Sequence, residues 1–257
     1  MNSVVSFITR KIPRKYLQQF SGIGQRVLML AYRGSKVICP VCENKFRKFL
    51  PYGRLKVREN ALCPGCLALE RHRLIWIYLK EKTDFFTRAQ DVLHIAPESC
   101  FIDRFEKMHG TKYVTADAES PWAKVKLDVH SMPFTDNQFD VVLCNHVLEH
   151  VKDDIQAMRE INRVLKPGGY AILQVPFFNP IPEKTIEDDS ITDPVEREQV
   201  YGQSDHVRKY GHDYCNRIEQ SGLTAIADSF VKELMPETID RFKLPLNEII
   251  YKAVKAS

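Results

Sequence analysis

Short apolar runs alternate with amphipathic stretches from about residue 91 to the C-terminus. Apolar runs of four to eight residues predict buried strands, whereas apolar positions that recur every three or four residues predict helices. An alternation of the two is typical of βαβ units, whose parallel strands form one sheet with helices on its faces. We therefore expect an α/β fold with a mainly parallel, doubly wound sheet. Strands are expected at Val92–Ile95, Tyr113–Ala116, Val125–Val129, Phe139–Cys144 and Tyr170–Val175, a closing antiparallel pair at Leu223–Phe230 and Glu248–Val254, and helices at Cys100–Met108, Asp153–Leu165 and Tyr214–Gln220.

The N-terminal part of the chain has a different pattern, in which basic and apolar residues are interleaved and acids are absent from residues 4–33. Ile8, Ile12, Tyr16 and Phe20 recur every four residues and predict one apolar helix face, although Pro13 weakens the middle turn. One interpretation is an interfacial helix that lies on an anionic membrane surface. The other is a helix that packs on its own protein and leaves its Lys and Arg side chains in solvent.

Charge also divides the chain. Residues 1–66 contain thirteen Lys and Arg and two acids, a balance of +11, so residues 67–257 carry −7 of the net charge of +4. A basic front end on an acidic body indicates an anionic partner for the front end.

Two C-x2-C motifs, Cys39-Pro-Val-Cys42 and Cys63-Pro-Gly-Cys66, are separated by twenty residues. Each tight turn presents two sulfurs, and four thiolates about 2.3 Å from one ion satisfy tetrahedral Zn²⁺. Because the protein fills all four positions, the predicted Zn²⁺ is structural rather than catalytic. A redox pair or an iron–sulfur site explains two matched motifs less well. The net charge of −2 on such a site can be offset by the neighbouring basic residues Lys45, Arg47, Lys48 and Arg71.

Composition limits the class of protein. With 44% hydrophobic and 10% aromatic residues, the 257-residue chain can bury a core and does not resemble a disordered protein. No uninterrupted apolar run reaches about 18 residues, so no transmembrane helix is predicted. Seven cysteines, three of them isolated, suit a reducing compartment rather than a disulfide framework. The N-terminus lacks a secretory signal, and its likeness in composition to a transit peptide is outweighed because the basic stretch runs directly into the cysteine motifs. We therefore expect a cytoplasmic protein, peripheral to a membrane if the N-terminal helix binds one.

These features divide the chain into four parts. A basic amphipathic segment at 1–36 precedes a zinc ribbon at 37–68, a connecting helix at 69–88 and the α/β body at 89–257. Within the body, residues 176–212 form a long insertion, which is expected to act as a lid or substrate platform.

Two stretches of the body carry a specific resemblance. They are Leu127–His150, with the sequence LDVHSMPFTDNQFDVVLCNHVLEH, and Val164–Leu173, with the sequence VLKPGGYAIL. On these motifs, residues 91–176, about a third of the chain, resemble the core of a class I S-adenosylmethionine-dependent methyltransferase of the broad type-11 group. The resemblance implies a Rossmann-like methyltransferase sheet, here with a small N-terminal zinc ribbon. The whole chain resembles a bacterial group of such enzymes, and the ribbon-plus-methyltransferase layout is also similar to a ribosomal RNA methyltransferase family.

The resemblance implies roles for residues at the strand ends, where doubly wound sheets bind ligands. Asp117 corresponds to the acid that binds both ribose hydroxyls of S-adenosylmethionine. Asp128 corresponds to the acid that accepts the adenine amino proton, with Val129 and His130 beside the base. Asn145 and His146 would face the sulfonium and the acceptor. Without a ligand role, Asp117 and Asp128 would be ordinary loop or N-cap acids.

The first loop departs from the family pattern. The family has an acid and a glycine-rich turn after the first strand, whereas this chain has His94-Ile-Ala96-Pro-Glu98-Ser-Cys100, without glycine and with one fewer N–H donor at Pro97. His94 and Ala96 would line the cofactor here. Our hypothesis is that Glu98 supplies a carboxylate to the ammonium group of the cofactor. The alternative is a first-turn acid favoured by the helix dipole.

Histidines supply the candidate acid–base groups. His146 is the candidate catalytic base, and His150 lies one helical turn further, where it could contact the substrate. Within the insertion, His206, Arg208 and Tyr210 offer a base, an anion clamp and a hydroxyl donor. The alternatives are a histidine that shapes the helix after the fourth strand, and a solvated loop with its own ion pairs.

We therefore expect a methyltransferase that uses S-adenosylmethionine and holds structural Zn²⁺, and whose acceptor is a small molecule or a glycan- or lipid-linked molecule. A second hypothesis is an RNA methyltransferase that docks RNA on the ribbon and the +11 segment. The acidic body and the absence from the insertion of a basic stripe and of an Asn/Asp-Pro-Pro-aromatic signature weigh against RNA. A third is a non-catalytic binding module whose first loop has lost the cofactor, against which stand Asp117 and Asp128.

Overall fold

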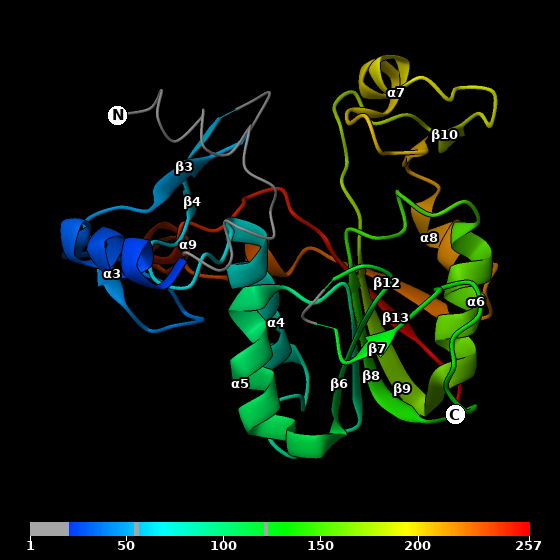
Figure 1. Cartoon of the computed structure of the whole chain (residues 1–257), viewed down its shortest axis with the longest axis horizontal. Coiled ribbons are helices and arrows are strands. Elements are labelled where there is room, and N and C mark those ends of the chain that lie inside the picture. Colours follow the sequence, from blue (N-terminus) through cyan, green and yellow to red (C-terminus); the bar gives the residue numbers. More distant parts are fainter. Residues whose placement is uncertain (1–20, 54–56, 121–122) are drawn as a thin grey trace. The chain divides into compact units, whose positions relative to one another are not determined.

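The computed structural model describes residues 21–53, 57–120 and 123–257. They form two compact units (Figure 1). The first comprises the described residues up to Ile77 together with Leu234–Leu246, and the second comprises Tyr78–Glu233 and Asn247–Ser257. The predicted helix through Ile8 and Phe20 lies outside the described residues. In the part of the chain that is described, no helix has the length and apolarity needed to cross a bilayer.

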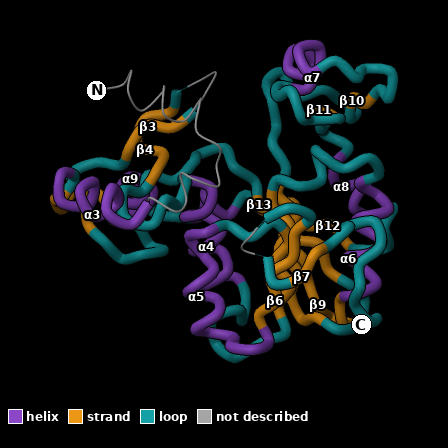
Figure 2. The backbone as a smooth tube through the Cα atoms, viewed as in Figure 1, coloured by secondary structure: helices purple, strands orange, loops and turns teal. Residues whose placement is uncertain are grey.

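The second unit is built on a seven-stranded sheet with the order β12-β13-β9-β8-β5-β6-β7. Figure 2 shows the strands of this sheet in orange. The central strands β5 to β9 pair in parallel, whereas β13 runs antiparallel to both β9 and β12. The chain moves outward from β5 in one direction and returns to β8 on the other side of β5, so the switch point lies between β5 and β8. The strands are β5 (Val92–Ile95), β6 (Tyr113–Asp117), β7 (Val125–Lys126), β8 (Phe139–Asn145), β9 (Leu165–Gln174), β12 (Thr224–Asp228) and β13 (Ile250–Val254).

Helices cover both faces of this sheet, with α5 (Ser99–His109) on one side and α6 (Asp154–Val164) and α8 (Tyr214–Glu219) on the other (Figure 1). The side chain of Asp153 caps α6 by accepting a hydrogen bond from the Gln156 N–H at 2.8 Å. The buried residues of α6 recur at helical spacing and complete the core: Ala157, Met158, Ile161 and Val164.

The fold class and the strand order along the chain are as the sequence predicts, with differences at particular elements. The third strand is shorter than expected, and Asp128 forms an isolated bridge with Ser131 instead of extending it. β9 begins at Leu165, five residues before the predicted start, and contains the Pro-Gly-Gly turn. The insertion at 176–212 contains α7 (Pro194–Tyr201) and the two-residue strands β10 (Ile186–Glu187) and β11 (Arg208–Lys209), which pair with each other.

Among its described residues, the first unit contains two small hairpins and three helices, one of which it shares with the second unit. β1 (Arg33–Ile38) pairs with β2 (Lys45–Phe46), and β3 (Leu50–Tyr52) pairs with β4 (Arg58–Leu62). α3 (Ser21–Ala31) precedes them, and α4 (Glu70–Lys82) follows and continues into the second unit. The body predicted at 89–257 therefore differs from the observed second unit. Residues 234–246, with α9 (Pro236–Phe242), join the first unit although the chain returns to the sheet afterwards.

Candidate functional site

The two C-x2-C motifs fold into matching turns. In the first, the Glu43 N–H donates to the Cys39 carbonyl at 2.7 Å and the Cys39 N–H donates to the Asn44 carbonyl at 3.1 Å. In the second, Leu67 and Cys63 make the same pair of bonds, at 3.0 Å to the Cys63 carbonyl and 2.9 Å to the Ala68 carbonyl. Glu43 and Leu67 both have a φ of 61°, so each turn closes through one left-handed residue.

The four sulfurs form one cluster, within 4.8 Å of one another. The Sγ atoms of Cys39 and Cys66 are 3.6 Å apart, and those of Cys42 and Cys63 are 3.7 Å apart. Ligands on a tetrahedron with metal–sulfur bonds of about 2.3 Å are separated by about 3.8 Å. The donor set and its spacing therefore fit Zn²⁺ held by the predicted residues, with all four positions filled.

Arg73 lies beside this cluster, and the sequence analysis missed it. Its buried guanidinium donates to the carbonyls of Ala61, Ala68, Asn60, Phe242 and Lys243 at 2.7 to 3.1 Å, and it stacks 4.2 Å from the Phe49 ring. Burial lowers the pKa of Arg73, and the charges of the neighbouring thiols act against that shift. One arginine thus ties the second cysteine turn to residues 242–243. The sequence alone does not distinguish Arg73 from Arg71, the neighbouring arginine that we expected to offset the charge of the cysteine site.

In the second unit, the candidate cofactor residues gather at the carboxyl ends of β5, β6, β7 and β8. Non-glycine residues with positive φ follow both strands at the switch point: Ala96 with 49° after β5 and His146 with 55° after β8. The turn that carries glycine in the methyltransferase pattern is therefore made here by a left-handed alanine, a conformation that costs a residue with a Cβ about 1–2 kcal/mol. Such strain is concentrated at functional sites.

Glu98 joins the two sides of this switch point. One carboxylate oxygen contacts His94 Nε2, and the other accepts from Asn145 Nδ2 at 3.0 Å. His94 Nδ1 lies 2.7 Å from the hydroxyl of Tyr113, whose pKa is raised by burial and then by the charge of Glu98. The side chain of Glu98 is only 14% exposed. Residues of β5, β6 and β8 thus hold the Glu98 carboxylate at the switch point, and its role toward the cofactor stays a prediction.

Asp117 and Asp128 lie on adjacent strand ends, as expected. Oδ1 of Asp117 accepts from the N–H groups of Glu119 and Ser120, both at 2.7 Å, and Oδ2 has no hydrogen bond from the described residues. The exposed carboxylate of Asp128 accepts from the N–H and the ring Nδ1 of His130, whose hydrogen bonds lower the pKa of Asp128. The carboxylate of Asp128 therefore stays ionised and available to a ligand at neutral pH.

The structure brings three of the candidate histidines together around a buried acid. His146 Nδ1 lies 3.3 Å and His150 Nε2 lies 3.9 Å from Oε1 of Glu149. The ring of His206 packs edge-on against that of His150, with 4.8 Å between centroids. Burial lowers the pKa of His206. Of these four residues only Glu149 had no role in the sequence analysis.

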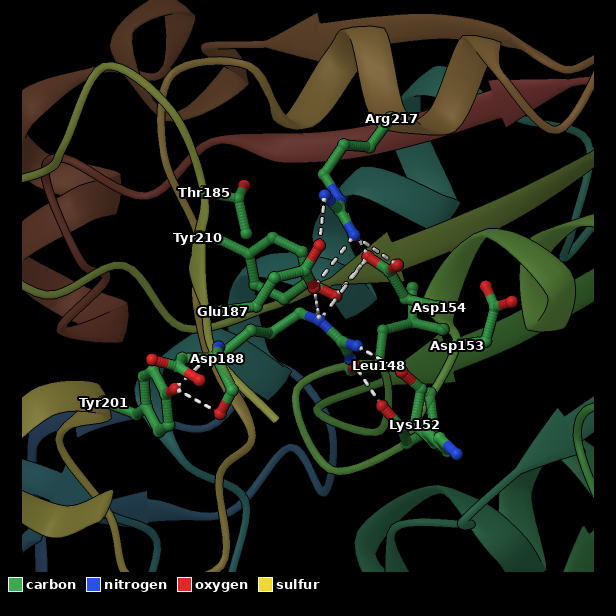
Figure 3. A network of polar contacts seen from close by, with 12 residues as sticks. Leu148, Lys152, Asp153, Asp154, Thr185, Glu187, Asp188, Tyr201, Tyr210 and Arg217 are labelled. Carbon is green, nitrogen blue, oxygen red and sulfur yellow. Dashed lines mark hydrogen bonds and ion pairs between the residues drawn. The ribbon is translucent and has the colours of Figure 1, made fainter. Parts of the chain in front are cut away.

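Arg208 and Tyr210 have intramolecular partners. Arg208 is 3% exposed and binds Glu187, 2.9 Å away, and the carbonyls of Leu148, Val151 and Lys152. The buried hydroxyl of Tyr210 donates to Asp154 at 2.9 Å. Figure 3 shows Tyr210 and Arg217 converging on Asp154 and Glu187. These contacts attach the insertion to the start of α6, and the predicted roles in anion binding and catalysis stay predictions.

The second unit has a doubly wound sheet with acids at adjacent strand ends beside its switch point. These features are typical of the class of α/β proteins that bind nucleotide-like ligands at that edge. Residues 88–173 match the family model described as a methyltransferase domain. Residues 88–173 therefore form a methyltransferase domain of the type-11 group, which confirms the resemblance seen in the sequence.

Several known proteins are similar to parts of the chain. Uncharacterized protein YafE of Escherichia coli is 30% identical over 107 residues, 41% of this chain and 47% of that protein. Demethylmenaquinone methyltransferase of Staphylococcus carnosus is 46% identical over 48 residues, 19% of this chain and 20% of that protein. The chain thus spans about half, or less, of the length of these relatives. A solved S-adenosylmethionine dependent methyltransferase from Mesorhizobium loti is 15% identical, with a TM-score of 0.46, covering 70% of this chain and 97% of that one.

Proposed function

We propose that this chain transfers the methyl group of S-adenosylmethionine to a small-molecule or glycan- or lipid-linked acceptor. The observation that carries the proposal is the pair Asp117 and Asp128 at the ends of β6 and β7, inside the segment that matches the methyltransferase domain. The similarity of one short segment to demethylmenaquinone methyltransferase supports methyl transfer to a small molecule.

The residues at the switch point fit the cofactor. Asn145 is 5% exposed, and its Oδ1 has no hydrogen-bond partner among the described residues, so one buried acceptor at the end of β8 is left unsatisfied. Asp117, with Oδ2 open, would hold the ribose hydroxyls, and Asp128 with Val129 would hold the adenine. Glu98 would pair with the ammonium group. When bound, the cofactor supplies an activated methyl group on a sulfonium.

The protein then has to align the acceptor, exclude water and remove a proton where the acceptor carries one. His146 is suited to that last task. Glu149 can accept its Nδ1–H, which leaves Nε2, buried and without a partner among the described residues, as the proton acceptor. The insertion contacts the loop that holds these residues, because the Val207 N–H donates to the Glu149 carbonyl at 2.9 Å.

Binding of S-adenosylmethionine to zinc-replete protein, measured by calorimetry, tests the proposal. Asp117→Ala should weaken binding by about 10–100-fold, because a charge-assisted hydrogen bond contributes about 1.5–3 kcal/mol. Asp103→Ala, which removes an exposed acid on α5, is the matched control and should bind as the intact protein does. No binding to the intact protein would refute cofactor use, and the binding-module hypothesis would replace it.

The role of Glu98 needs its own variant. Glu98→Gln keeps the size of the side chain and removes the charge, so it should lower the affinity for S-adenosylmethionine more than the affinity for an analogue that lacks the ammonium group. An equal effect on both ligands, or no effect, would show that Glu98 acts on the loop rather than on the cofactor.

A further inference from the structure

Three potential metal ligands meet where the segment after β8 contacts the insertion. The ligand atoms of Glu149, His150 and His206 lie within 4.8 Å of one another. Glu149 is 1% exposed and His206 is fully buried, whereas the side chain of His150 is 35% exposed. All three belong to the second unit, so this cluster is separate from the four cysteines.

Backbone carbonyls set the tautomer of both imidazoles, that is, which ring nitrogen carries the hydrogen. His150 Nδ1 lies 3.1 Å from the carbonyl oxygen of Asp205, and His206 Nδ1 lies 3.3 Å from that of Tyr201. A carbonyl oxygen only accepts, so each Nδ1 carries the hydrogen and donates it. In the neutral rings, each Nε2 is therefore left as a lone pair. Histidines that bind metals are oriented in this way, with the second ring nitrogen donating to a carbonyl or carboxylate.

The atoms that face one another in this cluster are all acceptors. Among the described residues, Oε2 of Glu149 and Nε2 of His206 are buried without any hydrogen-bond partner. Within the same residues, no lysine or arginine pairs with Glu149, whose ion-pair contacts are His146 and His150. A buried carboxylate beside imidazole lone pairs is costly unless a cation lies between them.

We propose that Glu149, His150 and His206 bind a divalent transition-metal ion of the zinc class. Two imidazoles and one carboxylate form a donor set that suits Zn²⁺ and leaves at least one coordination position for water or another oxygen ligand. Bonds of about 2.0–2.2 Å bring tetrahedral ligand atoms to about 3.4 Å of one another, so the cluster has to contract by roughly an ångström. The half-exposed side chain of His150 can make that movement. His146 would be a neighbour of the ion, because its Nδ1 lies 3.3 Å from Oε1 of Glu149.

Metal content distinguishes this site from the cysteine site. The intact protein, equilibrated with Zn²⁺ and freed of excess by gel filtration, should hold two zinc ions per chain, one for each cluster. His150→Gln and Glu149→Gln should each reduce this to one. His212→Gln, which removes an exposed histidine of the same insertion, is the matched control and should retain two. His150→Gln is the decisive variant because its side chain is partly in solvent, so the protein should remain folded.

Titration of metal-free protein with Co²⁺ provides an independent measurement. A four-thiolate site gives strong thiolate-to-metal charge-transfer absorption, and an imidazole–carboxylate site does not. We expect one equivalent with that absorption and a second without it, and the second should be absent in His150→Gln. A single zinc ion in the intact protein, or two ions retained in both His150→Gln and Glu149→Gln, would overturn the proposal. Neither readout depends on methyl transfer.

Discussion

We expect the attachment of the insertion, residues 176–212, to the rest of the second unit to depend most on Asp154. It is 1% exposed, accepts from the Tyr210 hydroxyl at 2.9 Å, and binds Arg217 through two hydrogen bonds at 2.6 and 3.0 Å. Burial lowers the pKa of Arg217, but the hydrogen bonds and charge of Asp154 raise it overall, so the guanidinium stays charged. Asp154→Ala leaves that charge, and the buried hydroxyl, without their main partner.

The magnitude follows from these contacts. Removing one partner of a buried ion pair costs about 3–5 kcal/mol, and an unsatisfied buried hydroxyl costs about 1–3 kcal/mol. Because the groups share one network, the two costs do not add, and we expect about 4 kcal/mol for Asp154→Ala. Asp154→Asn keeps an acceptor for Tyr210 and should lose about half as much. Glu187→Ala removes the other acid of the network, which is 41% exposed, and should cost about 1 kcal/mol.

Hydrogen exchange measured by mass spectrometry suits this test, because a chain of two units does not guarantee a two-state unfolding curve. Peptides that cover residues 203–212 should exchange about a thousand-fold faster in Asp154→Ala, since each 1.4 kcal/mol is a factor of ten. Peptides from α5, on the other face of the sheet, serve as the internal reference. The reasoning is refuted if Asp154→Ala and Glu187→Ala accelerate exchange equally, because burial would then not decide the cost.

Three further outcomes follow from local features. Cys42→Ser should deprotect amides of residues 37–68 and leave exchange in β8 unchanged, because loss of the Zn²⁺ held by the cysteines removes folding energy from the first unit. Equal loss in β8 would contradict separate units. Hydrogen bonds from Arg163 lower the pKa of Glu160, so its contribution to stability is complete above the ordinary value of 4.5 and is lost as pH falls through the lowered value. Unfolding midpoints of the intact protein and Glu160→Gln should therefore differ at pH 7 and converge in acid, and a constant difference would exclude that linkage. Ala96→Gly should change stability by less than about 1 kcal/mol, because relief of strain offsets the added entropy of the unfolded chain. Ala96→Val should lower the thermal midpoint. A lower midpoint for Ala96→Gly than for Ala96→Val would argue against the left-handed turn.

Local sequence determined the elements and the features that lie at their ends. Strand positions follow from apolar runs whose burial does not depend on distant residues, which is why β5, β6 and β8 were predicted to within a residue. The cysteine cluster was predictable because each C-x2-C motif makes its own turn. Asp117 and Asp128 were predictable for a similar reason, since parallel strands present their carboxyl ends at one edge.

The left-handed turn at Ala96 could not be predicted from the sequence, because contacts with distant residues impose the backbone conformation of the first loop. Ala96 is held by a hydrogen bond from its N–H to the Ala116 carbonyl on the neighbouring strand, at 2.9 Å. That bond, with the anchoring of Glu98 by Asn145, stabilises a left-handed turn that local propensity disfavours. The loop after β5 therefore adopts a left-handed turn without the glycine that the family pattern has there.

Tertiary structure alone decided which side chains meet. His150 and Asp205 are 55 positions apart, and Tyr210 and Asp154 are 56 apart, yet their contacts assemble the histidine cluster and place Tyr210 in the core rather than at an open site. Residues 234–246 likewise join the first unit by returning to Arg73. Periodicity reports the burial of an element and not the identity of its neighbour, so long-range partners of polar residues are set by packing. The sequence by itself therefore determined the methyltransferase sheet and the cysteine site, and the folded chain determined what surrounds them.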